Sequence, residues 1–185
     1  MVMPNYGDKK YWNKRYQSQT HCTFDWLEDF YSIQPLISKY VSKNDRILMM
    51  GCGNSKLSED MYDNGYKNII NIDISGVVID IMRERNKHSR PEMKWIEMDG
   101  LDLEYLENSF DVVLDKSTLD AILCGEMSFI NSAIMLKEIQ RVLKVDGVYL
   151  AISYGSPECR VFHLEREHLS FDLNCYLLSK ISIFS

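Results

Sequence analysis

The fold follows from one stretch of ten residues, Arg46-Ile47-Leu48-Met49-Met50-Gly51-Cys52-Gly53-Asn54-Ser55. Four consecutive apolar residues, 47–50, are too few for a helix and are typical of a strand buried on both faces at the centre of a parallel sheet. Two glycines then allow a sharp turn into a helix predicted over 56–64. Glycines at such a turn also let a ligand lie against bare main chain. On its own the stretch predicts either a nucleotide-like ligand or an ordinary tight turn.

The next predicted strand, 67–74, favours the ligand. It is rich in isoleucine and carries Asp73 near its end, 20 residues after Gly53. In a βαβ nucleotide fold, an acidic residue at this point hydrogen-bonds the ribose hydroxyls. Asp73 is also placed to cap a helix that starts at Ser75, and the two roles are compatible. The glycine turn, the helix and the acid together favour a bound adenosine.

Further along the chain, predicted strands and helices alternate. Strands are expected over 94–99, 110–114 and 148–153, and helical segments over 77–86, 118–123 and 129–143. Five strands that alternate with helices predict an α/β fold, with a mostly parallel central sheet and helices on both faces.

The C-terminal residues fit this pattern less clearly. The alternation over 171–178 predicts a sixth strand, after a polar stretch over 156–168. His163 and His168 in that stretch are five residues apart, a poor helical pair for a metal, and are expected to be solvated loop residues.

The residues before the first strand, 6–41, contain no convincing strand. Helical segments are expected around Trp12 and Tyr16, which share one helical face, from Thr23 toward Tyr31, and over 33–41. Aromatic residues at helical spacing are most often part of the core. A segment in this position is also suited to close over a ligand as a lid.

Composition excludes several classes of protein. A chain of 185 residues with 45% hydrophobic and 26% charged residues suits one soluble globular domain. The net charge of −6 argues against a protein that binds a nucleic-acid backbone. Five scattered cysteines without a CxxC pair suit reduced thiols in the cytosol or nucleus and offer no zinc site. No apolar run of 18 residues occurs, so the sequence predicts neither secretion nor a membrane span.

Three nucleotide ligands compete for the glycine turn. A P-loop would close on Gly-Lys-Ser/Thr, and the order Asn54-Ser55-Lys56 is wrong for it. A dinucleotide site requires a third glycine three residues after the second, where this chain has Lys56. S-adenosylmethionine, which has no phosphate and binds through its adenosine and its amino-acid end, passes both tests.

Several motifs together resemble one family. They are Tyr11-Trp12-x-x-Arg15-Tyr16, Phe24-Asp25-Trp26, the Arg46–Ser58 region, Met98-Asp99 and Phe110-Asp-Val-Val-Leu-Asp-Lys-x-Thr-Leu-Asp-Ala121. Over about residues 6–155 the chain resembles the lysine methyltransferases that modify translation elongation factor 1-alpha, in particular their small single-domain type 4 branch.

The resemblance implies a Rossmann-like class I methyltransferase fold in one domain, 1–185. Its parts are a helical lid segment over 6–41, a cofactor-binding core over 46–155 and an incomplete substrate-side hairpin over 156–185. The implied cofactor is S-adenosyl-L-methionine, with S-adenosyl-L-homocysteine as product. The residues expected to bind it are Asp73 at the ribose, Asp99 and Gly100 at the adenine, Gly51 under the methionine portion, Gly53 in the same turn, Lys116 at the edge, and Trp12, Tyr16 and Trp26 closing over it. Aromatic faces attract a sulfonium by cation–π interaction, although these three rings are also suited to plain core packing.

The chain departs from the family pattern at two points. Most class I methyltransferases have an acid two positions before the first glycine, where this chain has Met49. The fold also ends in a hairpin of sixth and seventh strands, and only the segment 171–178 is a candidate. Either residue 185 is not the natural end of the protein, or the sheet lacks its last edge strand and leaves the sixth strand exposed.

The chemistry of a lysine acceptor requires that its ammonium group lose a proton. Asp115 follows the fourth strand at the substrate end of such a fold, so it is expected either near the target amine or as a structural acid paired with Lys116 or Arg141. Cys52 is expected to be inert packing.

Three functions stay open. They are protein lysine methylation with elongation factor 1-alpha as substrate, methylation of a small amine, and cofactor binding without activity. The first implies a cytoplasmic protein with a protein partner and with no nucleic-acid or membrane partner. The oligomeric state is not predicted.

Overall fold

The computed structural model describes residues 4–18 and 23–178. Helices and strands alternate through most of this length, as the sequence predicted. In chain order the elements are α1 Lys9–Ser18, α2 Phe30–Tyr40, β1 Ile47–Met50, α3 Leu57–Asp63, β2 Ile69–Asp73, α4 Gly76–Asn86, β3 Lys94–Glu97, β4 Phe110–Lys116, α5 Thr118–Leu123, α6 Ser128–Val142, β5 Leu143–Ile152 and α7 Pro157–Leu164.

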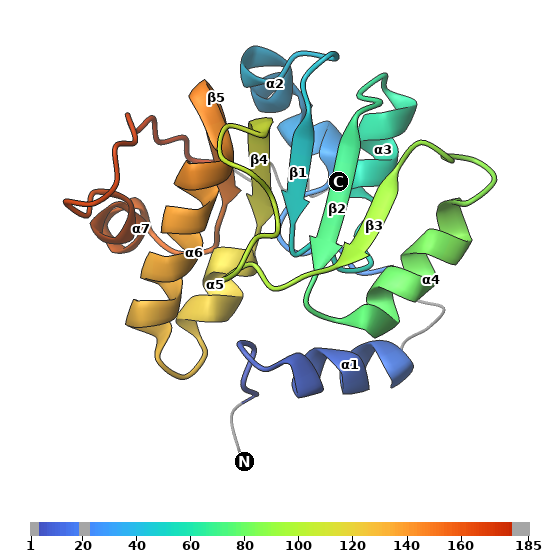
Figure 1. Ribbon diagram of the computed structural model, residues 1–185, viewed down its shortest axis with the longest axis horizontal. Helices are drawn as coiled ribbons and strands as arrows, with labels where there is room; N and C mark the ends of the chain where they lie inside the picture. The colour runs from blue at the N-terminus through green and yellow to red at the C-terminus, as the bar shows by residue number, and fades with distance from the viewer. Residues whose placement is uncertain (1–3, 19–22, 179–185) are drawn as a thin grey trace, which may run out of the picture.

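The sheet has five parallel strands in the order β3-β2-β1-β4-β5 (Figure 1). Ile47 of β1 pairs with Ile69 of β2 on one side and with Val112 of β4 on the other. From β1 the chain adds β2 and then β3 on one side of the sheet. It then returns to the other side of β1 and adds β4 and β5. Open α/β sheets bind their ligands at this reversal point, beyond the carboxyl ends of the strands.

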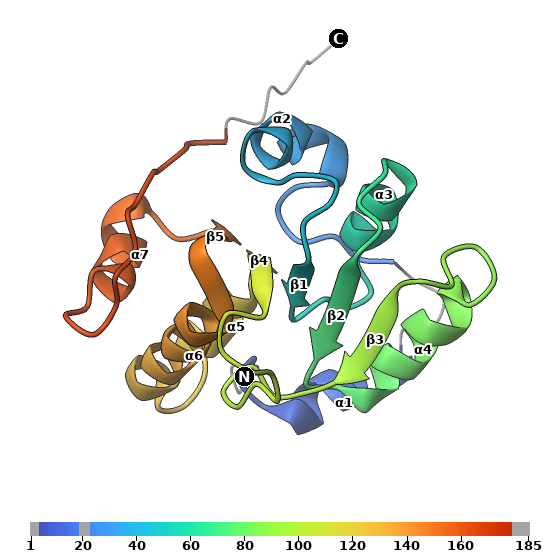
Figure 2. The same cartoon turned by 45° about the horizontal axis from the view of Figure 1, so that its top comes forward.

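Helices cover both faces of the sheet, as predicted (Figure 2). On one face a buried apolar cluster joins α2, α3 and α4 to the strands and includes Phe30, Met61 and Val78. On the other face a second cluster joins α5 and α6 to the strands and includes Leu119 and Leu136. Because β1 is buried on both faces, all four of its residues are apolar.

Helix α1 lies across the carboxyl ends of the strands instead of on a face of the sheet (Figure 1). The Asn13 side chain and the Ser75 hydroxyl are 2.6 Å apart, which links α1 to the start of α4. The single buried residue of α1 is Tyr16, which joins the first apolar cluster. The helix therefore covers the edge of the sheet where a ligand is expected.

The prediction of a helical segment from Thr23 toward Tyr31 is wrong. Residues 23–29 belong to no helix or strand, and α2 begins only at Phe30. Leu27 has a positive φ of 65°, and Asp29 caps α2 by accepting the Ser32 N–H at 2.9 Å. An N-cap must lie outside the helix that it starts, so the helix cannot extend back through Trp26.

The last strand of the sheet starts earlier than predicted. β5 begins at Leu143, and Asp146-Gly147 lies inside the strand, where its pairing with β4 is irregular. Asp146 has a φ of 62° there. A bulge of this kind lets the strand continue past extra residues without breaking the sheet.

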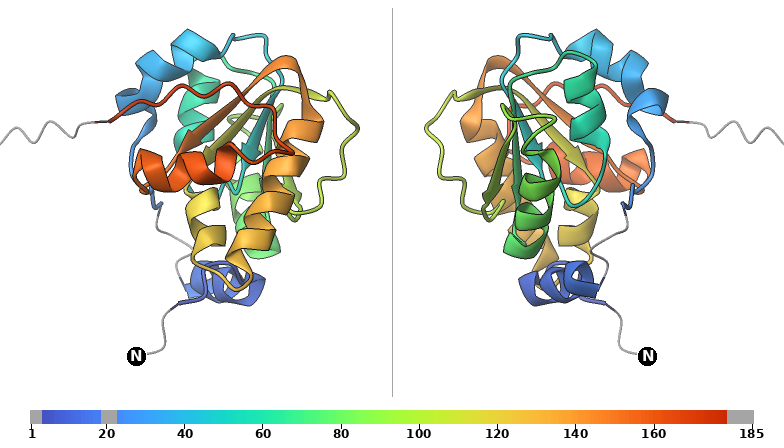
Figure 3. Two further views of the ribbon diagram at one scale, coloured as in Figure 1. Left: turned by 90° about the vertical axis from the view of Figure 1, so that its left-hand side faces the viewer. Right: turned by 90° about the vertical axis from the view of Figure 1, so that its right-hand side faces the viewer.

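The predicted sixth strand over 171–178 is also wrong. This segment is not a strand and leaves the β5 side of the sheet for α2 (Figure 3). Phe171 packs against Tyr149 at 5.8 Å between ring centroids, and the Tyr176 hydroxyl accepts a hydrogen bond from Lys39 at 2.7 Å. Side-chain contacts with α2 thus hold the segment, and residues 156–178 form no hairpin. The remainder of the predicted hairpin, 179–185, lies outside the described residues.

Candidate functional site

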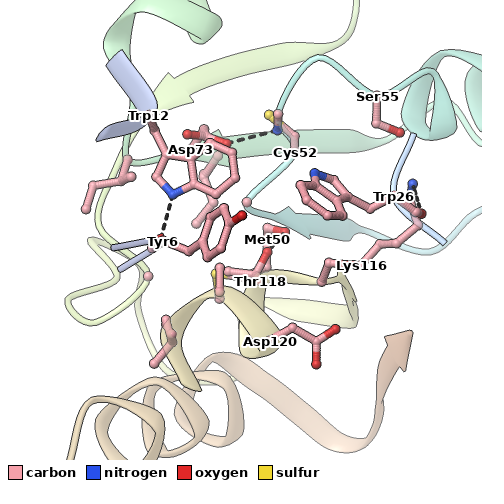
Figure 4. A pocket seen from close by; sticks show the side chains of 18 of the residues that line it. Tyr6, Trp12, Trp26, Met50, Cys52, Ser55, Asp73, Lys116, Thr118 and Asp120 are labelled. Atoms are coloured by element: carbon pink, nitrogen blue, oxygen red, sulfur yellow. Dashed lines mark hydrogen bonds between the residues drawn. The ribbon is translucent and has the colours of Figure 1, made fainter. Parts of the chain in front are cut away.

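A cavity of about 460 Å³ opens where the sequence places the ligand, at the carboxyl ends of β1, β2, β3 and β4 (Figure 4). This volume lies within the usual range for small-molecule sites. Its walls come from the strand ends, from α5 and from the residues before α2. The cavity therefore joins segments that are far apart in the sequence.

The floor of the cavity is the glycine turn after β1. Gly51 and Gly53 both have positive φ values, 58° and 53°. A Cβ atom on Gly51 would lie 2.1 Å from Thr118 Oγ1, and one on Gly53 would lie 2.9 Å from the Tyr16 hydroxyl. Thr118 donates its hydroxyl proton to the Met50 carbonyl at 2.9 Å. The turn thus needs glycine both for its backbone conformation and for its close packing against α1 and α5.

Asp73 closes the end of β2 beside this turn. One carboxylate oxygen accepts the Gly53 N–H and the other accepts the Ser75 N–H, each at 2.9 Å. The Ser75 hydroxyl, and not Asp73, accepts the Val78 N–H at the start of α4. Burial raises the pKa of Asp73 to about 6, against the opposing effect of the two N–H donors. Asp73 therefore fixes the shape of the glycine turn and faces the cavity.

Aromatic rings form the wall contributed by the N-terminal residues. Trp12 and Tyr16 stack with ring centroids 5.7 Å apart, and Tyr6 lies 6.0 Å from Trp12 and 6.4 Å from Trp26. The Trp12 indole N–H donates to the Tyr6 carbonyl at 2.6 Å (Figure 4). Arg15 stacks on Trp12 and Trp26 at 5.5 and 5.4 Å from the ring centroids. This wall offers several π faces to a cationic ligand.

Asp25 ties the wall to the sheet. Its carboxylate pairs with Lys116 Nζ at 3.0 Å and accepts the Ser55 hydroxyl. Lys116 also donates to the Trp26 carbonyl at 2.9 Å. Residues near Trp26 are thereby fastened to the end of β4 and to the turn after β1.

The opposite wall comes from α5 and the chain after β5. Asp120 lines the cavity and pairs with Arg160 of α7 at 2.6 Å, while it accepts the Tyr154 N–H at 2.9 Å. Tyr154 also lines the cavity, and 86% of its surface is exposed. Part of this wall is therefore exposed to solvent.

Asp115 does not lie on the cavity. Its carboxylate is 1% exposed and accepts the N–H groups of Thr118 and Leu119 and the Tyr149 hydroxyl, at 2.7, 3.1 and 2.8 Å. Burial raises its pKa to about 6. The geometry corrects the expectation that Asp115 approaches the target amine. Its partners are Tyr149 and the start of α5, not Lys116 or Arg141, and these contacts favour a structural role.

Comparison with known proteins accounts for this cavity. Residues 48–151 match the model of a methyltransferase domain. The chain is 33% identical to mouse EEF1A lysine methyltransferase 4 over 177 residues, which is 91% of this chain and 69% of that protein. The chain belongs to the class I methyltransferases, in the branch of the eEF1A lysine methyltransferases. The methyl donor of this family is S-adenosylmethionine, and the cofactor predicted from the sequence is thereby confirmed.

A longer relative matches more closely in sequence. The methyltransferase is 42% identical to mouse eEF1A lysine and N-terminal methyltransferase over 167 residues, or 88% of this chain. The chain spans about a quarter of that relative, 24% of its length. Among solved structures, a SAM-dependent methyltransferase from Methanosarcina mazei superposes with a TM-score of 0.60 at 22% identity, over 74% of this chain and 63% of that one. This likeness confirms the Rossmann-like fold.

The methyltransferase brings all of its predicted cofactor-binding residues to the one cavity. These residues are Trp12, Tyr16, Trp26, Gly51, Gly53, Asp73, Asp99, Gly100 and Lys116. Their contact with the cofactor stays a prediction. The sequence did not predict roles at the site for Tyr6, Asp25 or Asp120, which also line or adjoin the cavity. Asp25 lies within the Phe24-Asp25-Trp26 motif that carries part of the family resemblance, but the motif does not reveal which residues Asp25 contacts.

Two other predicted features concern metals and membranes. His163 lies within α7, not in a loop as expected, and its Nδ1 is 2.7 Å from the Arg166 guanidinium. Among residues 4–18 and 23–178, no cluster of three or more His, Cys, Asp or Glu side chains is suited to a metal ion. None of the helices in these same ranges combines the length and apolar composition that a membrane crossing requires.

The raised pKa of Asp73 predicts a pH-dependent affinity for S-adenosylhomocysteine. The ionised carboxylate is the better acceptor for ribose hydroxyls, so affinity is complete above a pKa of about 6 and is lost as the pH falls through it. Calorimetric titration from pH 7.5 to pH 5 is expected to show the dissociation constant rising by up to about tenfold per pH unit below 6. The product is the suitable probe because no acceptor amine takes part. An affinity that is flat over this range would contradict the role of Asp73.

Proposed function

We propose that this methyltransferase transfers the methyl group of S-adenosylmethionine to the side-chain amine of a lysine in a protein, with eEF1A as the substrate. The observation that carries the proposal is the 33% identity to EEF1A lysine methyltransferase 4, across 69% of that relative. The longer relative in mouse is also named for eEF1A lysine methylation. A cytoplasmic location, and the absence of nucleic-acid and membrane partners, belong to the same proposal.

The residues around the cavity suit the cofactor. Bare main chain at Gly51 and Gly53 leaves room for its methionine portion, and Asp73 stands ready for its ribose hydroxyls. Asp99 and Gly100, after β3, would bound the adenine. We retain the division of the chain into a lid segment over 6–41 and a cofactor-binding core over 46–155 as part of this proposal.

The bound cofactor supplies a methyl group on a positively charged sulfur. The rings of Trp12, Tyr16 and Trp26 would attract that charge, each by about 0.5–2 kcal/mol according to how far water is excluded. Much of the rate of an in-line transfer comes from holding the two reactants in line. The chain's contribution would be to hold the aromatic wall over the donor and to admit the acceptor amine past Asp120 and the exposed Tyr154.

The activity is tested with isotopically labelled cofactor and purified eEF1A, followed by mass spectrometry of its peptides. The expected result is a methyl label on a lysine side chain of eEF1A. A matched control is eEF1A whose lysines have been chemically acetylated beforehand, which makes each amine a non-nucleophilic amide and should prevent uptake of label. Absence of label from every lysine would contradict the proposal. Turnover of a small amine in its place would point to a metabolite substrate, and cofactor binding without any transfer would point to an inactive module.

A further inference from the structure

The residues 23–29, which we call the strap, form part of the cavity wall without regular secondary structure of their own. They run from Thr23 to Asp29, the N-cap of α2, and carry the Trp26 ring into the cavity. Since the strap belongs to neither a helix nor a strand, side-chain contacts must hold it in place.

One side chain of the strap makes contacts with two distant parts of the site. The Asp25 carboxylate pairs with Lys116 Nζ at 3.0 Å, accepts the Ser55 hydroxyl, and lies 3.4 Å from the Lys56 N–H. Lys116 belongs to the end of β4, while Ser55 and Lys56 follow the glycine turn. Asp25 therefore joins the strap to both sides of the point where the sheet order reverses.

The burial of this ion pair makes it sensitive to substitution. The Lys116 side chain is 5% exposed and that of Asp25 is 25% exposed. Asp25 is the one carboxylate that pairs with Lys116 among the described residues, and the other acceptor is the Trp26 carbonyl at 2.9 Å. Removal of one partner from such a pair leaves an uncompensated buried charge, which is strongly unfavourable. The strap would then lift and return the Lys116 ammonium to water.

We propose that Asp25 is a positioning residue, whose ion pair with Lys116 latches the strap over the bound cofactor and slows the departure of the cofactor. This inference rests on the proposed function, because it places S-adenosylmethionine in the cavity beneath Trp26. The latch acts through Trp26 and Lys116, and Asp25 itself does not touch the reacting atoms. The pair must open each time that product leaves and fresh cofactor enters.

The test compares Asp25→Asn with Asp29→Asn, a matched control in the same strap. Asp29 caps α2 and does not line the cavity, and asparagine is an equally good N-cap. Calorimetry and a stopped-flow displacement assay give the dissociation constant and dissociation rate of S-adenosylhomocysteine, and a thermal melt reports the fold. Asp25→Asn is expected to raise both the dissociation constant and the dissociation rate at least tenfold, with Tm within about 3 °C of the wild type. Asp29→Asn should leave both binding values within twofold.

A second variant with a smaller structural change tests the proposal if Asp25→Asn does not fold. Ser55→Ala removes one contact of Asp25, together with the acceptor of the Leu57 N–H at the start of α3, and leaves Lys116 paired, so a three- to fivefold faster dissociation is expected. In turnover assays Asp25→Asn should raise the KM for the cofactor more than it lowers kcat, since saturating cofactor refills an open site. The proposal is overturned if Asp25→Asn has the dissociation constant and the dissociation rate of the wild type. It is also overturned if the affinity of Asp25→Asn falls only together with a large loss of Tm, because the substitution would then act through the fold. Failure of the wild type itself to bind the product would contradict the proposed function.

Discussion

Replacement of Gly51 with alanine is expected to raise the dissociation constant for S-adenosylhomocysteine more than 100-fold and to abolish methyl transfer. The residue has a φ of 58°, which an alanine adopts at a cost of about 1–2 kcal/mol. Its new Cβ would lie 2.1 Å from Thr118 Oγ1, so the turn or α5 must move and the Thr118 bond to the Met50 carbonyl must break. A lost hydrogen bond adds about 1 kcal/mol, and a floor displaced beneath the methionine portion weakens binding further. Together these costs favour a rearranged turn over the binding-competent one by about 3 kcal/mol, and affinity falls by the same factor as the population of the competent turn, roughly 100-fold.

Gly65→Ala provides the matched control for this substitution. Gly65 also has a positive φ, 99°, but its Cβ would meet only Lys43 Cδ at 3.7 Å, and it does not line the cavity. Alanine there should lower the free energy of unfolding by about 1–2 kcal/mol and leave product affinity within threefold. Calorimetry and denaturant unfolding of both variants separate backbone strain from loss of the site. Equal loss of affinity in the two variants would contradict the role assigned to Gly51.

Replacement of Asp73 with asparagine is the second substitution with a large expected effect. The carboxylate accepts two backbone N–H groups, from Gly53 and Ser75, and an amide offers only one oxygen for them. The N–H left without an acceptor costs about 1–3 kcal/mol, and loss of a charged acceptor for the ribose costs about 1.5–3 kcal/mol more. The dissociation constant for the product should therefore rise at least about 50-fold at pH 7.5. The same variant should also lose the pH dependence of affinity near pH 6.

Asp115→Asn is the control for Asp73→Asn. Both acids lie near the carboxyl ends of the two strands that flank β1, both are buried, and burial raises the pKa of each to about 6. Only Asp73 lines the cavity. Asp115→Asn should therefore destabilise the fold by about 2–3 kcal/mol, through its contacts with α5 and Tyr149, and change product affinity less than fivefold. If Asp115→Asn lost transfer while keeping both affinity and stability, Asp115 would have the catalytic role that its geometry argues against.

The sheet could be predicted because its signals are local. The run of apolar residues in β1 and in β4 shows burial on both faces, and the glycine turn follows β1 directly. Asp73 could be predicted from its distance in sequence to the glycines alone, because the second strand of a βαβ unit ends about 20 residues after the glycine turn. Six of the nine residues predicted to bind cofactor meet at one cavity because parallel strands present their carboxyl ends at a single edge, and they are Gly51, Gly53, Asp73, Asp99, Gly100 and Lys116. The other three, Trp12, Tyr16 and Trp26, come from the residues before α2.

The errors occur where tertiary contacts override local pattern. The alternation over 171–178 is that of a strand, yet this segment packs on α2 through Tyr176 and on β5 through Phe171. Aromatic spacing near Trp26 suggests a helix, but Asp29 starts α2 later and leaves the strap without regular structure. No local rule identifies these outcomes, because the competing partners are distant in the sequence.

The role of Asp25 illustrates the same limit within the site. Its partners Ser55 and Lys116 lie 30 and 91 residues further along the chain. An aspartate between two aromatic residues carries no sign of such contacts. The distinction between Asp115 and Asp120 is similar: only the direction in which each carboxylate points decides which one reaches the cavity.

The central claim is that the glycine turn after β1 and the carboxylate at the end of β2 together hold the adenosyl group of the cofactor. A crystal structure of the protein with S-adenosylhomocysteine tests it most directly. The account predicts one product molecule in the cavity, with its ribose hydroxyls on Asp73, its adenine beside Asp99 and Gly100, and Trp26 closed over it. A cavity that stays empty at saturating product, or a product bound elsewhere on the protein, would contradict the account.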